Sequence, residues 1–594
     1  MAEKPLSLRL AQTIVPFGVG AIYSANYQSF VAMDTTQWND SDPIELHRLS
    51  EKLGVDGFRS PKSDSDFRFL AQDLSQEGAP YFRFPRWLFC QGCRRLTYFS
   101  KDEEQGRIPE CSECKKNYTP MRFVAICEDG HMQDVQWHDW VHDVKRGSKD
   151  ENLCKWVPDK STLIFQTKKN AGGSLAASFI ECQILKCKAS KSLEGILRPE
   201  ALLKRSGHPQ RCHGRQPWED SQTHCGKLLR AVHHGAGNVH FASIEKAIDI
   251  PPASDHDAYK ILYQKVTEDD TFPWLNHQVV HDRTVRTLAR KYETNVDTIE
   301  KIWEQYQKES DGITASQVSA SVGTSSTSAP RDILFEEWEA FRSPRTKYDD
   351  EDDFNISSVD ISEVSPDSVV DKQTSVLLDR VVQGKRLRIV KALAGFTRLK
   401  SNDEQKILTR PDLTKITDEP VKRWLPAVQI FGEGIFISFK ESLLKEWEKK
   451  REVQAVAERV NSILGNSTFG AMPESTDPRA IMLHTLSHII IKRAAFSAGY
   501  SLSSIEERLY ASPTTSNKPS MAGILFYTAA GDTEGSLGGL VKLAEPFQLF
   551  RIIQSALIDA MWCSQDPICS EISSGYESVN RAACHACCFL PETS

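Results

Sequence analysis

The chain has 594 residues, and at roughly 150 residues per domain this length predicts several domains. Its formal net charge is −7, no signal peptide is evident, and no apolar run reaches the ~18 residues of a membrane span, so we expect a cytoplasmic protein without membrane contact. In that compartment its 15 cysteines, mostly in spaced pairs, favour metal sites over disulfides.

Residues 1–88 are predicted to form a β-rich N-terminal domain. Strand-like apolar pieces around Ile22 and at Phe30–Met33 are interrupted by turns. Gly18 and Gly20 indicate a turn between such pieces rather than a ligand-binding loop.

Residues 89–121 contain the most specific motif in the chain. Cys90 and Cys93 form one Cys-x-x-Cys pair, and Cys111 and Cys114 form a second after 17 intervening residues. In a zinc ribbon, two hairpins at such a separation each contribute two thiolates to one tetrahedral zinc. We therefore predict a zinc ribbon with a structural or interaction role rather than a catalytic one.

A cluster of cysteine, histidine and tryptophan follows the ribbon. Cys127 and His131, together with His138 or His142 and with Cys154, are able to form a further metal site. Clustered aromatic and histidine side chains are also typical of a packed core, and we favour packing here.

Residues 122–260 as a whole are predicted to form a second cysteine-rich zinc module. Its later cysteines are more loosely spaced than those of the ribbon, and we expect them to bind a second structural zinc. These cysteines are Cys182, Cys187, Cys212 and Cys225.

The same stretch is basic. Between Cys182 and Arg230, ten lysines and arginines outnumber four acidic residues. Such a surface can lie against a DNA phosphate backbone, and a solvated basic face is the alternative. The candidate DNA-binding residues are Lys186, Lys188, Lys204, Arg205 and Arg215.

A helical segment and a linker are predicted next. Residues 261–310 favour a helical hairpin. Residues 311–375 are predicted to be a flexible linker, Ser/Thr-rich at first and then acidic, with order returning at 333–340. Residues 349–371 carry nine acidic and no basic side chains, and without them the formal charge is +2. This near-neutral remainder neither requires nor excludes DNA binding.

Residues 376–594 are predicted to form an α/β domain. Strand-like pieces between residues 381 and 439 alternate with glycine turns, and a long helix is expected over residues 443–464. A further helix begins at Ile481, and an apolar strand from Gly523 leads into a glycine-rich turn.

Two histidines on that further helix share one face, because they lie four residues apart. His484 and His488 have a spacing that can bind zinc, but the metalloprotease pattern requires glutamate where this chain has Thr485. We favour half-buried histidines that are hydrogen-bonded to neighbouring elements. The alternative is a metal-dependent hydrolase or nuclease that uses both histidines with Glu506 or Glu507.

The last cysteines of the chain are predicted to bind zinc. Cys584 and Cys587 form a Cys-x-x-Cys knuckle, and Cys569 lies upstream. Cys563 and Cys588 are candidates for the remaining ligand, and a cluster of buried free thiols is the alternative. The whole chain is therefore expected to hold two to three zinc ions.

Missing motifs argue against some enzyme classes. The sequence contains no GxxxxGK[ST] phosphate-binding loop, no GxSxG nucleophile turn and no HxK pair of phospholipase-like nucleases. These absences argue strongly against an ATPase of the Walker type and less strongly against a nuclease. We expect a protein that is not an enzyme.

Several ordered motifs resemble one known family. They are the N-terminal Leu8–Ile22, the Cys-x-x-x-His motif at Cys127–His131, the Cys-x-Gly-Arg-x-Pro-Trp motif at Cys212–Trp218, and the final run Ala582–Ser594. The chain resembles the DrmB family of the bacterial anti-phage defence system DISARM from end to end. Its C-terminal part is also similar to a domain of unknown function that follows some DNA helicases.

The resemblance implies partners and a role. The partners are the DISARM helicase DrmA, in a heterodimer, and DNA. We expect a mixed α/β, multidomain, zinc-bound subunit, not itself catalytic, that helps the helicase engage foreign DNA; a pure protein scaffold is the other alternative. The family pattern also has a cysteine directly after the sequence that ends here at Ser594, so either the chain is cut short or Cys563 or Cys588 replaces that ligand.

Overall fold

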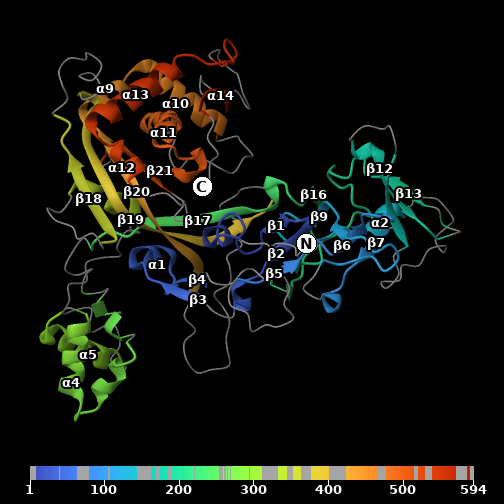
Figure 1. The fold of residues 1–594 in the computed structure, drawn as a ribbon, viewed down its shortest axis with the longest axis horizontal. Coiled ribbons are helices and arrows are strands. Elements are labelled where there is room, and N and C mark those ends of the chain that lie inside the picture. The colour runs from blue at the N-terminus through green and yellow to red at the C-terminus, as the bar shows by residue number, and fades with distance from the viewer. Residues whose placement is uncertain are drawn as a thin grey trace.

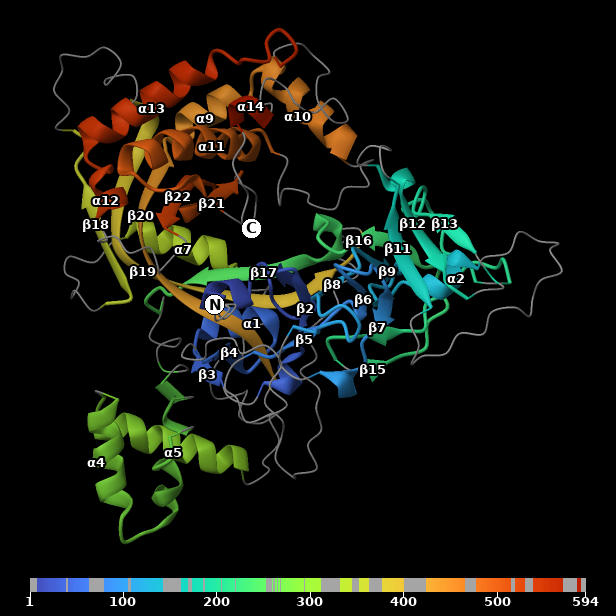
Figure 2. The same ribbon diagram turned by 45° about the vertical axis from the view of Figure 1, so that its right-hand side comes forward.

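The structure is a computed structural model, drawn in Figures 1 and 2. It describes residues 8–38, 41–62, 79–104, 108–142, 162–168, 174–184, 187, 189–204, 206–219, 221–252, 259, 262–263, 265–267, 269–292, 294–310, 332–343, 352–362, 376–399, 423–464, 477–513, 519–528, 538–569 and 585–588. The mixed α/β class expected from the sequence is confirmed, because helices and several sheets alternate along the chain.

An eight-stranded mixed sheet forms the centre of the fold. Its strands are β3 (Ser41–Ile44), β4 (Gly57–Pro61), β17 (Phe241–Ile248), β18 (Phe354–Val359), β19 (Leu378–Thr397), β20 (Trp424–Phe439), β21 (Ile505–Ser512) and β22 (Met521–Thr528). The main order is β17-β19-β20-β22-β21, with all neighbours antiparallel. β18 pairs with β19, and β4 pairs in parallel with β20. Distant parts of the sequence therefore share one sheet.

Helices cover both faces of this sheet (Figure 2). Because neighbouring residues of a strand point to opposite faces, Ile437 and Phe436 of β20 enter different cores. Ile437 packs under α11 (Pro478–Ala498) and α13 (Pro546–Ala560), whereas Phe436 stacks on aromatic residues of α7 (Ile333–Arg342). The helical layer that contains α11 and α13 also contains α9 (Glu441–Glu448), α10 (Arg451–Leu464), α12 (Gly539–Lys542) and α14 (His585–Cys588).

The first and last strands in this order approach each other, so the sheet is strongly curved. Lys246 of β17 lies 3.2 Å from the carboxylate of Glu506 on β21, and Arg508 of β21 donates to the carbonyl of Lys246 at 3.1 Å. Glu337 of α7, which is fully buried, accepts hydrogen bonds from Arg508 and from the backbone of Ile248. Buried ion pairs thus join the two sheet edges.

In the N-terminal half, the described residues form five small sheets. They comprise β1 (Ile22–Ala25), β2 (Gln28–Ala32) and β5 (Tyr81–Arg83); β6 (Trp87–Cys90), β7 (Leu96–Tyr98) and β8 (Tyr118–Pro120); β9 (Phe123–Ile126), β10 (Met132–Asp134) and β16 (Arg230–His233); β11 (Leu163–Thr167), β12 (Ser178–Cys182) and β13 (Ser190–Ser192); and β14 (Arg215–Gln216) with β15 (Ser221–Gln222). The short helices α1 (His47–Leu53) and α2 (Trp137–Val141) lie in the same half. Cys127, Cys182 and Cys212 are buried in one hydrophobic core here.

A helical lobe lies away from the central sheet in both views (Figures 1 and 2). It contains α4 (His281–Lys291) and α5 (Val296–Ser310), the helical pair that the sequence predicts, preceded by a 3-10 turn at Phe272–Asn276. Apolar side chains of these three elements form a core of their own.

Three details differ from the sequence expectations. The acidic run expected to be mobile contains β18, which pairs with β19 and buries Phe354 and Ile356. The glycines at 432 and 434 lie inside the continuous strand β20, because their lack of a side chain lets the carbonyl groups of β22 approach. The single helix expected over 443–464 is divided into α9 and α10. Among the described residues, no helix is long and apolar enough to span a bilayer.

Candidate metal centres

The predicted ribbon brings its four thiols together. Cys90 and Cys93 occupy the turn between β6 and β7, and Cys111 and Cys114 occupy the turn before β8. The Sγ atoms of Cys90 and Cys114 are 3.2 Å apart, and those of Cys93 and Cys111 are 3.7 Å apart. Sulfurs bound to one tetrahedral zinc at about 2.3 Å are about 3.8 Å from each other, so the four thiols fit one zinc ion.

The two knuckles of the ribbon share one backbone design. In each, the residue after the second cysteine has positive φ, 64° at Arg94 and 52° at Lys115, and its N–H donates to the carbonyl of the first cysteine at 3.0 Å. Burial acts to raise the pKa of Cys111, but backbone N–H groups outweigh it and lower the pKa to about 6. At Cys111 the backbone N–H groups therefore favour the thiolate that a metal needs, whereas burial raises the pKa of Cys90 in the other knuckle.

A second group combines Cys127, His131, Cys212 and Cys225. Cys127 and His131 close the turn from β9 to β10, with the Sγ atom of Cys127 3.5 Å from His131 Nδ1. A sulfur and a nitrogen on one tetrahedral zinc are about 3.6 Å apart, which matches this distance. His131 Nε2 lies 3.0 Å from the Thr223 hydroxyl, so a neighbouring side chain orients the ring.

A buried arginine supports the turn of this second group. Arg398 follows β19 and donates to the carbonyl of Gly130, at 3.0 Å, between Cys127 and His131. It also donates to the carbonyls of Gly20, at 2.7 Å, and Val239. Burial lowers its pKa to about 9, and the guanidinium remains charged at neutral pH.

A third group combines His142, Cys182 and Cys187. His142 follows α2 and donates from Nδ1 to the carbonyl of His138 at 2.7 Å. Its Nε2 lone pair is thereby directed at the Sγ atom of Cys187, 3.2 Å away. His138 stacks on this ring and belongs to none of the metal groups of the described residues. Cys154, a further candidate ligand, lies outside the described residues.

The pairing of these cysteines differs from the sequence expectation. Cys182, Cys187, Cys212 and Cys225 were expected to share one zinc, but the structure divides them between the second and third groups. The reason is topological: β16 pairs with β9, which brings the segment after Cys225 beside the strand that directly precedes Cys127. Core packing, which we favoured for Cys127 and His131, holds for Cys127, which is buried in a hydrophobic core, and both residues also lie beside thiols.

The fourth group lies near the C-terminus. Cys563, Cys569 and Cys587 come together, with the Sγ atoms of Cys569 and Cys587 3.8 Å apart. Cys563, named from the sequence as a substitute, is buried and follows α13. Cys584 lies outside the described residues, and Cys588 is absent from this group.

The two helix histidines are paired with one of the two candidate carboxylates. Glu507 of β21 approaches His484 and His488, whereas Glu506 points to the opposite face of the strand. Glu506 lies beside Lys246 and Lys391 and accepts a hydrogen bond of 2.6 Å from the Tyr527 hydroxyl.

The candidate DNA-binding residues are only partly described. Lys204 and Arg215 are exposed, and Lys186, Lys188 and Arg205 lie outside the described residues. Beside Lys204 and Arg215, the loops that hold Cys212 and Cys225 expose Arg211, Lys227 and Arg230.

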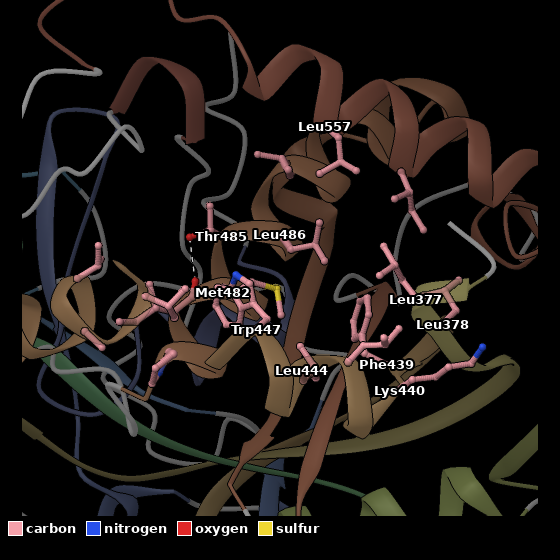
Figure 3. A pocket seen from close by; sticks show the side chains of 18 of the residues that line it. Leu377, Leu378, Phe439, Lys440, Leu444, Trp447, Met482, Thr485, Leu486 and Leu557 are labelled. Carbon is pink, nitrogen blue, oxygen red and sulfur yellow. Dashed lines mark hydrogen bonds between the residues drawn. The ribbon is translucent and has the colours of Figure 1, made fainter. Parts of the chain in front are cut away.

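An apolar cavity of about 680 Å³, drawn in Figure 3, has no cysteine in its lining. Trp447, Met482 and Leu557 line it, from α9, α11 and α13. Its lining has few polar groups and none of the metal-group residues, so its chemistry is unrelated to the metal centres.

Comparison of the chain with known proteins finds two family models and one relative that match it. A model described as a domain of unknown function (DUF8724) matches residues 9–241, and one described as the MrfA Zn-binding domain matches residues 486–588. The DISARM protein DrmB of Bacillus paralicheniformis is 27% identical over 597 residues, covering 95% of this chain and 94% of that protein. The chain is a homologue of DrmB.

The likeness to DrmB agrees with the family resemblance of the sequence motifs, and the zinc-binding match includes the fourth group. The first three groups lie inside the match to the domain of unknown function. Their ligand sets, of thiols and histidine nitrogens, are those that zinc prefers in proteins.

Proposed function

We propose that this chain is a zinc-organised, non-catalytic subunit of a DISARM-type anti-phage complex. It binds the helicase subunit DrmA and helps that helicase to engage foreign DNA. The observation that carries the proposal is the match to DrmB over nearly the full length of both proteins. A match of that extent compares whole proteins rather than one shared module.

The cysteine groups support a structural role for the metal. The first two groups each offer four described protein ligands. Structural zinc is usually enclosed by four protein ligands, whereas catalytic zinc keeps one position open to water or substrate. With the third and fourth groups, the cysteine-containing sites would hold up to four zinc ions, more than the two to three expected from the sequence.

The exposed basic residues beside the second group support contact with DNA. Arg211 and Lys227 flank Cys212 and Cys225 in sequence, and the N–H of Cys212 donates to the carbonyl of Lys227 at 2.8 Å. A metal that fixes these loops also fixes the cations that they carry. Rigid cations contact phosphates with a smaller loss of side-chain and loop entropy.

Binding of the purified chain to duplex and single-stranded DNA, measured across a salt series, tests the DNA contact. We expect affinity to fall steeply with salt, because each phosphate contact releases counterions. Replacing Arg211, Arg215 and Lys227 by glutamine should weaken binding and reduce the slope by about one per lost contact.

The matched control replaces Lys449, Lys450 and Arg451, three exposed basic residues at the junction of α9 and α10. It removes the same charge and should leave binding unchanged. Equal weakening by both variants would contradict a defined DNA surface at the second group. Failure of the chain to co-purify with DrmA would contradict the proposed partnership itself.

A further inference from the structure

Two imidazoles and one carboxylate converge between α11 and β21, outside the cysteine groups. Glu507 Oε1 lies 3.2 Å from His484 Nε2 and 3.5 Å from His488 Nε2. The two rings, one helical turn apart, have centroids 4.5 Å apart. One ligand atom from each of the three residues lies within 4.8 Å of the others.

The surroundings orient two of these three groups. His488 Nδ1 donates to the carbonyl of Cys588 at 3.0 Å, so in the neutral ring the Nε2 lone pair faces Glu507. The hydroxyl of Ser487, which also contacts the carbonyl of His484, lies against Glu507 Oε2, and Oε1 is the oxygen directed at the histidines. Histidines that bind metals commonly use one nitrogen for such a carbonyl and the other for the ion. Two acceptors that face each other require a proton or a cation between them.

The distances fit a cation. A charge-assisted N–H···O hydrogen bond is usually about 2.7–2.9 Å long, shorter than both contacts of Glu507 Oε1. A nitrogen and an oxygen bound to one tetrahedral zinc at about 2.0–2.1 Å are about 3.3–3.4 Å apart. The observed 3.2 Å and 3.5 Å lie on either side of that value.

We propose that His484 Nε2, His488 Nε2 and Glu507 Oε1 bind one divalent transition-metal ion, for which zinc is the best match to the donor set. The side chain of His484 is 40% exposed, so a fourth coordination position is accessible to water. Through the carbonyl of Cys588, the site is connected to the residue that follows Cys587 of the fourth cysteine group. The metal joins α11 to β21, and the hydrogen bond from His488 to Cys588 extends the site to α14.

Zinc binding by the full chain, measured by equilibrium dialysis and mass-spectrometric metal analysis, tests this site. The double variant H484A/H488A should bind about one zinc ion fewer per chain than the unchanged protein. Glu507→Gln keeps the size of the side chain and its bond to Ser487, and should weaken binding of that one ion at least about tenfold. The remaining zinc, held by cysteines, should be unaffected.

His281→Ala is the matched control. His281 donates from Nδ1 to a backbone carbonyl and lies 3.3 Å from Glu300, but it has one imidazole instead of two, so its loss should not change the zinc content. Circular dichroism identifies a misfolded variant. If H484A/H488A misfolds, the zinc affinity of Glu507→Gln is the measurement that tests the proposal. Unchanged zinc content and affinity in the folded variants would overturn the proposal and identify the three residues as an ion pair.

Discussion

At the scale of single residues, Arg398 connects the second metal group to the central sheet. Its guanidinium is buried among three backbone carbonyls and lies over the rings of Trp218 and Phe396. One of those carbonyls belongs to Gly130, inside the turn that presents Cys127 and His131. The geometry of the second group therefore depends on a side chain that is remote in sequence.

Replacing Arg398 by leucine should destabilise the protein by roughly 3 kcal/mol or more, because three buried carbonyls lose their donor. It should also accelerate zinc loss from the second group. Thermal unfolding and the rate of zinc transfer to a chelator measure the two effects. The exposed Arg290 supplies the control substitution, Arg290→Leu, which should change neither. Unchanged stability of Arg398→Leu would contradict the assigned role.

Residue spacing explains which metal groups were predictable. The ribbon was predicted because both knuckles are local Cys-x-x-Cys turns, whose geometry depends on a few neighbouring residues. The second and third groups combine ligands from distant loops, and the pairing of β9 with β16 determines which loops meet. The role of Arg398 has no local signal in the sequence.

At the scale of elements, buried ion pairs hold the curved sheet. Glu506 of β21 contacts Lys246 of β17 and Lys391 of β19, which belong to strands at the other end of the sheet order. Burial acts to raise the pKa of Glu506, but the two lysines and Tyr527 outweigh it and lower the pKa from 4.5 to about 2. The ionised carboxylate therefore stabilises the fold.

The sign of the pH effect follows from this lowered pKa. The contribution of Glu506 is present above about pH 4.5 and is lost as the pH falls towards 2, with a size of about 3 kcal/mol. Glu506→Gln should be less stable near neutral pH and should show a flatter loss of stability in acid. Denaturant unfolding at a series of pH values measures both. The exposed Glu446→Gln is the control, and a variant with an unchanged pH profile would contradict this account.

The elements also show where sequence patterns failed. The acidic run around Phe354 and Ile356 led us to expect mobility, and the alternation of these two apolar residues with polar ones was given no weight. The glycines of β20 suggested turns, whereas close approach of β22 explains them. The acidic composition of this segment describes only its average. Burial of the two side chains of Phe354 and Ile356 stabilises β18 in spite of that average.

At the scale of the whole molecule, the chain combines an N-terminal half that carries three candidate metal groups with a helix-covered sheet. Cys127, Cys182 and Cys212 are buried in the same core as Trp137 and Trp140, so metal and core are expected to form together. The C-terminal helices pack on the sheet through a separate apolar core.

Removal of zinc should therefore loosen the two regions unequally. We expect faster amide hydrogen exchange across β9, β10 and β16, and little change in β19, β20 and β22. Hydrogen-exchange mass spectrometry of the full chain, before and after treatment with a chelator and a thiol reagent, measures the contrast. Uniform loosening of both regions would contradict separate cores, and no loosening would contradict structural metal.

The most direct test of the central claim is the affinity of the DrmA helicase for DNA with and without this chain. The account predicts at least about tenfold tighter binding in the complex, with a steeper salt dependence, because the added subunit contributes its own phosphate contacts. Complex formation with unchanged affinity and salt dependence would contradict a role in engaging DNA and leave a protein scaffold. DNA cleavage by this chain alone would contradict the proposed non-catalytic role.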